Sequence, residues 1–198
     1  MIPIGITAYK QRLFTSTQGT FSCRLNDESF LITPYGVDRN YIEPEDIVRI
    51  DGLKREKGNL PSRSVLIHRD LYDRYKDINA VMIAHPPNIM AFGLSDIEFD
   101  SRTIPESYIM LRDVKELPFG INIKNPEKLS ASLTSKTPVV MIQNDGVIVT
   151  GNSLLQVFDR LEVAEFSAKA LIAADVIGKL KPINDEQVED LKKAFELE

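Results

Sequence analysis

Short apolar and β-branched runs, broken by turn residues, mark the strands that the sequence predicts. A hairpin is predicted by the runs TFSCRL at 20–25 and SFLITP at 29–34, which flank Asn-Asp-Glu. A turn and a further strand are predicted by EPEDIVRIDG at 43–52. A strand buried on both faces is indicated by the apolar run within NAVMIAH at 79–85. Two strands around a tight Asn-Asp-Gly turn are predicted by TPVVMIQNDGVIVTG at 137–151.

Apolar residues at helical spacing predict the helices. One begins within LPSRSVLIHRDLYDRYKD at 60–77, where Ser62 or Ser64 stands in position to cap it. Shorter helices are predicted within 88–96 and 125–135, the second with a proline in its first turn. The apolar face expected for the first of these helices comprises Leu66, Ile67, Leu71 and Tyr75.

The longest predicted helix runs from Ser153 to about Gly178, because its apolar residues follow a period of 3.6. A polar terminal helix is expected over 183–198. Strands and helices mix without regular βαβ alternation, which favours an α/β sandwich with a mainly antiparallel sheet. The length of 198 residues and the hydrophobic fraction of 43% suit a single domain over 1–198.

Charge and cysteine content narrow the classes of function. The formal net charge of −5 argues against general binding of a nucleic-acid backbone, but leaves room for a local cluster that binds a small anion. The lone Cys23 excludes an internal disulfide framework and a zinc site built on cysteines. No apolar run approaches the roughly 18 residues of a membrane span, and the N-terminus lacks a signal-peptide layout. We therefore expect a cytoplasmic protein that binds neither nucleic acid nor membrane.

His85 ends a predicted strand, where a metal ligand or a base is often presented. A zinc site, however, usually has three or four protein ligands, and the chain has two histidines in all. His85 is therefore either part of an unusual site or a polar residue at a strand end.

Five short motifs follow one another along the chain: GTFSCR at 19–24, ITPYG at 32–36, PSRSVLIHRDLY at 61–72, AVMIAHP at 80–86 and QNDGVIVTG at 143–151. In this order and spacing they resemble the class II aldolase and adducin head family, over a core of about 19–178. The resemblance implies an α/β/α sandwich with a mainly antiparallel central sheet and a homo-oligomer, commonly a tetramer. It also implies that the family's N-terminal helix is short or missing here.

The family's enzymes hold a zinc ion with three histidines and use a glutamate as acid and base. By the resemblance, the three metal positions fall on Ile83, His85 and Asp145, and the glutamate position falls on Ser64. Isoleucine offers no lone pair to a metal, and serine has no pKa suited to proton transfer near neutrality. The remaining candidate ligands, His85 and Asp145, form a weak set.

The family's phosphate cradle is better matched. Its positions fall on Gly19, Thr20, Gly36, Ser62 and Arg63, with Tyr35 in place of a small serine. The guanidinium of Arg63 is a strong partner for phosphate or carboxylate, beside an expected helix N-terminus that also favours anions.

Two hypotheses remain open. In the first, the protein has lost the zinc lyase chemistry and binds or assembles without catalysis, as adducin heads resemble aldolases without catalysing; no cofactor is then expected. In the second, it is a sugar-phosphate aldolase, epimerase or dehydratase with a rebuilt site. His85 and Asp145 would then act as base or as ligands of zinc or another divalent metal, while Arg63 and Ser62 hold a sugar phosphate.

Overall fold

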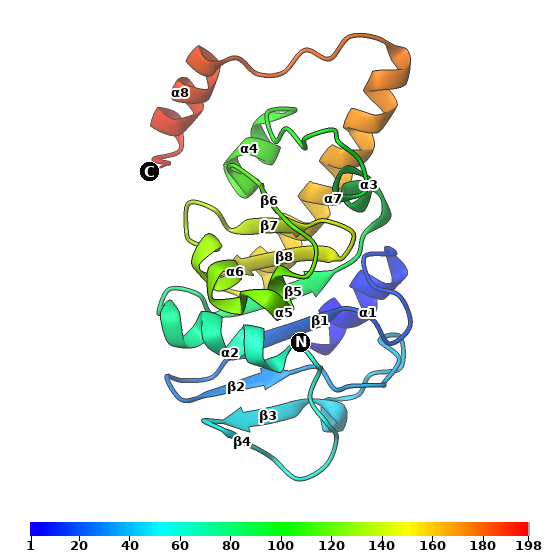
Figure 1. The fold of residues 1–198 in the computed structure, drawn as a ribbon, viewed down its shortest axis with the longest axis vertical. Coiled ribbons are helices and arrows are strands. Elements are labelled where there is room, and N and C mark those ends of the chain that lie inside the picture. The colour runs from blue at the N-terminus through cyan, green and yellow to red at the C-terminus, as the bar shows by residue number, and fades with distance from the viewer. Residues whose placement is uncertain (198) are drawn as a thin grey trace.

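An eight-stranded sheet forms the centre of the computed structural model, which describes residues 1–197. The strand order is β4-β3-β2-β1-β5-β8-β7-β6, and in Figure 1 the sheet extends from β4 at the bottom upward to β6, which lies below the helices at the top. The strands are β1 (Thr20–Arg24), β2 (Ser29–Ile32), β3 (Val48–Asp51), β4 (Lys54–Arg55), β5 (Ala80–Ala84), β6 (Lys115–Leu117), β7 (Val139–Ile142) and β8 (Gly146–Gly151). Every neighbouring pair is antiparallel except the parallel pair β6–β7.

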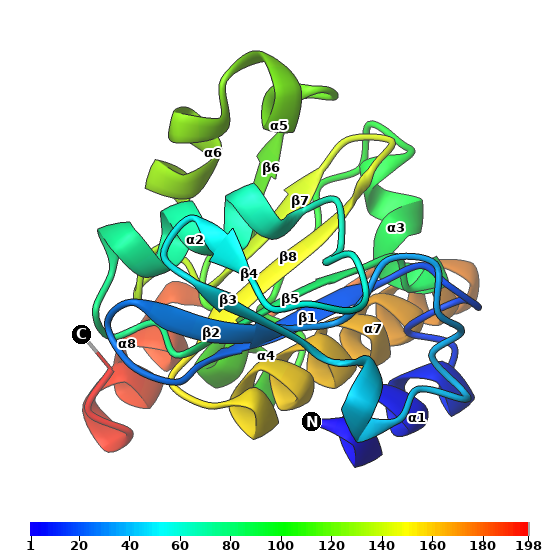
Figure 2. The ribbon, with the colours of Figure 1, turned by 90° about the horizontal axis from the view of Figure 1, so that it is seen from below.

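Helices cover both faces of this sheet, with α2, α5 and α6 on one side and α1 and α7 on the other (Figure 2). The helices are α1 (Ile2–Lys10), the 3₁₀ helix η1 (Pro44–Asp46), α2 (Val65–Arg74), α3 (Pro87–Gly93), α4 (Pro105–Leu111), α5 (Ile121–Lys124), α6 (Pro126–Ser132), α7 (Leu154–Ile177) and α8 (Asp185–Ala194). The result is the expected α/β/α sandwich around a mainly antiparallel sheet. No helix within residues 1–197 is long and apolar enough to cross a membrane.

Strand β5 shows how sequence dictates the layers. Successive side chains of a strand point to opposite faces. Met82 therefore packs into the core beneath α7, while Val81 packs into the core beneath α2 and Ile83 contacts its edge. A strand covered on both sides is apolar at every position, which is why its alternation is invisible in the sequence.

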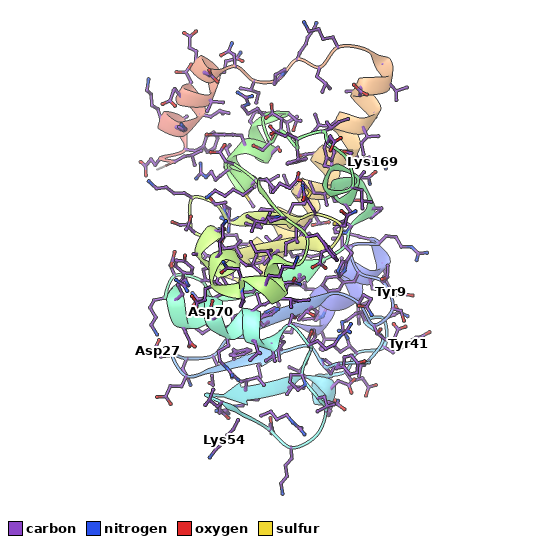
Figure 3. All side chains as sticks on the ribbon, viewed as in Figure 1. Tyr9, Asp27, Tyr41, Lys54, Asp70 and Lys169 are labelled. Carbon is purple, nitrogen blue, oxygen red and sulfur yellow. The ribbon has the colours of Figure 1, made fainter. Side chains whose placement is uncertain are left out.

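The predicted elements of the second half lie where expected. Ser153 caps α7 by accepting the Gln156 amide, and Asn125 caps α6 by accepting the Lys128 amide. Charged residues such as Asp27 and Lys54 lie at the periphery of the fold (Figure 3).

The predicted apolar face of α2 was partly wrong. Leu66 is 67% exposed, while His68 and Tyr72 are buried. The inner face of α2 is therefore set by polar partners: the Ser22 hydroxyl lies 2.6 Å from both His68 Nδ1 and the Tyr72 hydroxyl. Ser64 occupies the N-cap position, but its side chain makes no capping hydrogen bond.

Several short elements carried too little periodicity to be predicted individually. They include the nine-residue α1, the two-residue β4, the seven-residue α4, the three-residue β6 and the four-residue α5. The last of these is important because it forms one wall of the site described next.

Candidate functional site

A cleft of about 600 Å³ lies on the face of the sheet that α2 and α5 cover, a size suited to a small ligand. It receives residues from the loop before β1, the loop after β2, the start of α2, the end of β5, helix α5 and the β7–β8 turn. Segments far apart in the chain thus converge on one concave surface.

The structure brings all the residues singled out from the sequence to this cleft. One group lines the side nearest β1, β2 and α2, and it comprises Gly19, Thr20, Tyr35, Gly36, Ser62, Arg63 and Ser64. A second group comes from β5 and the β7–β8 turn, and it comprises Ile83, His85 and Asp145.

Three hydroxyl groups meet on the first side. Thr20 Oγ1 lies 2.7 Å from Ser62 Oγ, which in turn lies 3.1 Å from Ser64 Oγ. Thr20 and Ser62 are buried, whereas Ser64 is partly exposed. Each hydroxyl has one hydrogen that rotates about its C–O bond, so the cluster can turn hydrogens from these internal contacts toward an anion in the cleft.

Gly19 is required by its surroundings. Its φ of +91° lies in the left-handed region, and a Cβ there would come within 2.2 Å of the Phe14 ring. Gly36 also has a positive φ, but a Cβ would meet nothing within 4 Å. Gly19 therefore fixes the turn that leads into Thr20, while Gly36 keeps open space at the wall of the cleft.

Arg39 holds these two loops together. Its buried guanidinium donates to the carbonyl oxygens of Gly19, Pro34 and Val37. Burial lowers the pKa of Arg39 to about 10, and the nearby Asp38 carboxylate opposes this shift. Arg39 therefore remains a cation at neutral pH, beside the hydroxyl cluster.

Arg63 stands at the exposed edge of the same side. Its guanidinium carbon lies 5.5 Å from the centroid of the Tyr35 ring, a cation–π contact. Within residues 1–197 it has no ion pair and no side-chain hydrogen bond. The charge of Arg63 is thus free to meet an anion in the cleft.

A second polar group in the cleft comprises His85, Asn122 and Asp145. Burial lowers the pKa of His85, and the Asp145 carboxylate acts in the opposite direction. Asn122 donates from Nδ2 to Asp145 Oδ2 at 2.9 Å. A Cβ on Gly146 would lie 3.2 Å from His85 Nε2, so this glycine leaves room for the imidazole.

Sequence reasoning missed Asn122 as a cleft residue. It lies on the single-turn helix α5, where no motif or periodicity marks it. Its role is visible only from the contact with Asp145.

His68 lies behind the cleft and does not line it. It is fully buried, and burial lowers its pKa to about 3, so the imidazole is neutral at physiological pH.

Comparison with known proteins decides the family. The model of the Class II Aldolase and Adducin N-terminal domain matches residues 1–172. The chain belongs to this family. As a class II aldolase/adducin protein it is 24% identical, over 97% of its length and 94% of the relative's, to the 3-oxo-tetronate 4-phosphate decarboxylase of Haemophilus influenzae. It is 25% identical to the 5-deoxy-D-ribulose 1-phosphate aldolase of Bacillus thuringiensis, over 96% and 93% of the two chains.

Solved structures show the same fold. YgbL from Escherichia coli superimposes with a TM-score of 0.85 at 22% identity, over 97% of this chain and 95% of YgbL. The L-fuculose-1-phosphate aldolase of Thermus thermophilus superimposes with a TM-score of 0.77 at 22% identity, over 88% and 94% of the two chains.

The family's zinc ion does not fit the residues that this class II aldolase/adducin protein places in the cleft. Ile83 projects an alkyl side chain where the first histidine ligand is expected, which leaves His85 and Asp145 as donors. No group of three or more His, Cys, Asp or Glu side chains within residues 1–197 is arranged to hold a metal. Two donors fall short of a catalytic zinc centre, which has three protein ligands.

Proposed function

We propose that the cleft binds a small phosphorylated ligand, a sugar phosphate or a close relative of one, without the zinc lyase chemistry of the family's aldolases. One observation carries the proposal: Thr20 Oγ1 and Ser62 Oγ, 2.7 Å apart, lie in the same cleft as the unpaired guanidinium of Arg63. Hydroxyl donors beside a guanidinium suit the oxygens of a phosphate group.

Positive charge close to the cleft favours binding of an anion, although the net charge of the whole chain is negative. Arg39 is buried and bonded to carbonyl oxygens alone, so its positive charge is not cancelled by a carboxylate in direct contact. Buried charges are screened less than exposed ones, so Arg39 attracts an anion even at physiological salt. The names of the relatives point the same way, since the decarboxylase and the aldolase are both named for phosphorylated compounds.

The absence of lyase chemistry rests on two independent substitutions. Ile83 removes a metal ligand, and Ser64 stands at the position of the acid and base. Ser64 Oγ lies 3.1 Å from Ser62 Oγ, so it extends the hydroxyl cluster that would hold an anion.

The direct test is calorimetric titration with inorganic phosphate and with ribulose 5-phosphate, comparing wild type with Arg63→Ala. Loss of a charged hydrogen bond is expected to weaken binding about tenfold or more. Arg49→Ala is the matched control, because Arg49 is exposed, pairs with Asp51 at 2.9 Å and lies outside the cleft. Equal binding by wild type and Arg63→Ala would refute the proposal.

A second candidate is a metal-free rebuilt enzyme, supported by the His85 end of the cleft. A partly buried histidine with a lowered pKa is neutral at physiological pH and able to accept a proton, and Asn122 holds the nearby Asp145. Such a base would catalyse exchange of the protons next to the carbonyl of dihydroxyacetone phosphate in D₂O, which NMR detects. The candidate is favoured if the wild-type protein accelerates this proton exchange and His85→Asn does not. It is excluded for this probe if the wild-type protein leaves the exchange rate at the value measured without protein.

A further inference from the structure

A row of three residues crosses the floor of the cleft. Thr20 of β1 lies opposite Ile83 of β5, and Ile83 lies opposite Ile148 of β8. All three line the cleft. Residues paired across a sheet point to the same face, so the Thr20 hydroxyl and the two isoleucine side chains form one continuous strip.

The strip widens into an apolar middle section. Ile67 from α2 and Ile142 at the end of β7 line the cleft beside Ile83 and Ile148, and Ile123 of α5 is a fifth isoleucine in its lining. Neighbouring strands lie about 4.8 Å apart, so the apolar section spans roughly 5 to 10 Å from Thr20. Ile142 and Ile148 belong to the core beneath α2, which makes this floor part of the packed interior and not a mobile surface.

The position of Ile83 is informative because it adjoins both polar groups of the cleft. Ile83 lies opposite Thr20 across the β1–β5 pair and two residues before His85 in the chain. The chain of a ligand whose phosphate contacts Thr20 and Ser62 therefore meets Ile83 where it extends along the floor of the cleft toward β8.

We infer that the ligand is a phosphate monoester whose carbon chain is apolar next to the phosphate, in contrast to a fully hydroxylated sugar. The inference rests on the proposed function, since it takes Thr20, Ser62 and Arg63 as the anion end. Hydroxyl groups laid against isoleucine lose hydrogen bonds to water and gain no partner. An alkyl chain in the same place is stabilised by leaving water.

The test is a series of phosphate esters titrated calorimetrically into the full chain. The probes are inorganic phosphate, then methyl, ethyl, propyl and butyl phosphate, and erythritol 4-phosphate as the hydroxylated match to butyl phosphate. Each added methylene is expected to tighten binding up to about fourfold. Butyl phosphate is expected to bind at least about tenfold more tightly than erythritol 4-phosphate.

The variant Ile83→Thr tests whether the tighter binding of alkyl phosphates comes from this strip. Threonine keeps the β-branched shape and the strand preference of isoleucine but brings a hydroxyl to the floor. The ratio of the two four-carbon affinities should fall to about threefold or less. Ile97→Thr is the matched control, since Ile97 is 63% exposed in the loop after α3 and lies outside the cleft, and it should keep the wild-type ratio.

The outcomes separate the inference from the proposed function. If phosphate binds but butyl phosphate binds no more tightly than methyl or erythritol phosphate, the inference is wrong and the anion site stands. The inference is also overturned if Ile83→Thr keeps the wild-type ratio of affinities for butyl phosphate and erythritol 4-phosphate. The preference for the alkyl chain would then arise from contacts other than Ile83. Failure of every probe to bind overturns the proposed function, and the inference with it.

Discussion

Asn122 donates from Nδ2 to Oδ2 of Asp145 at 2.9 Å and thereby ties α5 to the β7–β8 turn. The contact fixes a carboxylate at the end of the cleft that holds His85. Burial lowers the pKa of His85, and this carboxylate alone acts to raise it. Asp145 therefore offsets part of the effect of burial on the pKa of His85.

Asp145→Asn is expected to lower the pKa of His85 further, because it removes the favourable charge and leaves the effect of burial. The pKa is measured by following the imidazole resonances by NMR as pH is lowered. Asp159→Asn is the control, since Asp159 is exposed on α7 and outside the cleft. A rise in the pKa of His85, or no change, would show that the two side chains are not coupled.

Replacing Ile83 by histidine, the residue expected at this family position, should restore affinity for zinc. Ile83 and His85 are two residues apart at the end of β5, so Ile83→His presents two imidazoles on the same face, with Asp145 as a third donor. Wild type purified without chelators is expected to contain far less than one zinc per chain. Ile83→His should bind zinc at least about tenfold more tightly than wild type, while Ile83→Asn should not. Elemental analysis that finds about one tightly bound zinc per wild-type chain would contradict this and revive the lyase hypothesis.

The protein is expected to form a closed homo-oligomer, as the family resemblance implied. Helix α7 leaves Phe166, Val176 and Ile177 exposed, and apolar side chains gathered along one helix are suited to a symmetric interface. Light scattering at tens of micromolar should give a multiple of the chain mass of 22.3 kDa. A clean monomer would count against it.

The fold was predictable where the pattern was long. The apolar run of β5 and the 24 residues of α7 each repeat one signal over many positions, so chance arrangements are excluded. Short elements such as the four-residue α5 have no room for a period. They are formed by tertiary packing, which the linear pattern does not record.

Only those site residues that belong to a motif could be predicted from the sequence. Motif order brought Thr20, Ser62 and His85 to one cleft, although they lie far apart in the chain. The role of Arg39 in holding two loops together could not be predicted, because its partners are backbone carbonyl oxygens, which every residue has. The buried contacts of His68 were equally hidden, since a histidine within an amphipathic pattern looks like a polar interruption.

His68 should make the protein sensitive to mild acid. In the folded state burial lowers its pKa to about 3, while in the unfolded chain it returns to about 6.5. Below pH 6.5 the unfolded state therefore binds one more proton than the folded state, so falling pH favours unfolding. The stability from this histidine is fully present above pH 6.5 and is lost as pH falls from 6.5 toward 3. Between pH 7.5 and 5.5 the loss is about 1.4 kcal/mol.

The chain's two histidines allow the source of this loss to be separated. Denaturant unfolding at pH 7.5 and 5.5 gives the change in unfolding free energy for wild type, His68→Asn and His85→Asn. His68→Asn loses the contact with Ser22 and is less stable at both pH values, but its pH dependence should be flatter by about 1.4 kcal/mol. His85→Asn should keep the contribution of His68, because His68 is fully buried behind the cleft, whereas His85 lines the cleft and is partly exposed. A pH dependence in His68→Asn equal to that of wild type would show that His68 can be protonated in the folded protein, and that its unpaired Nε2 reaches water.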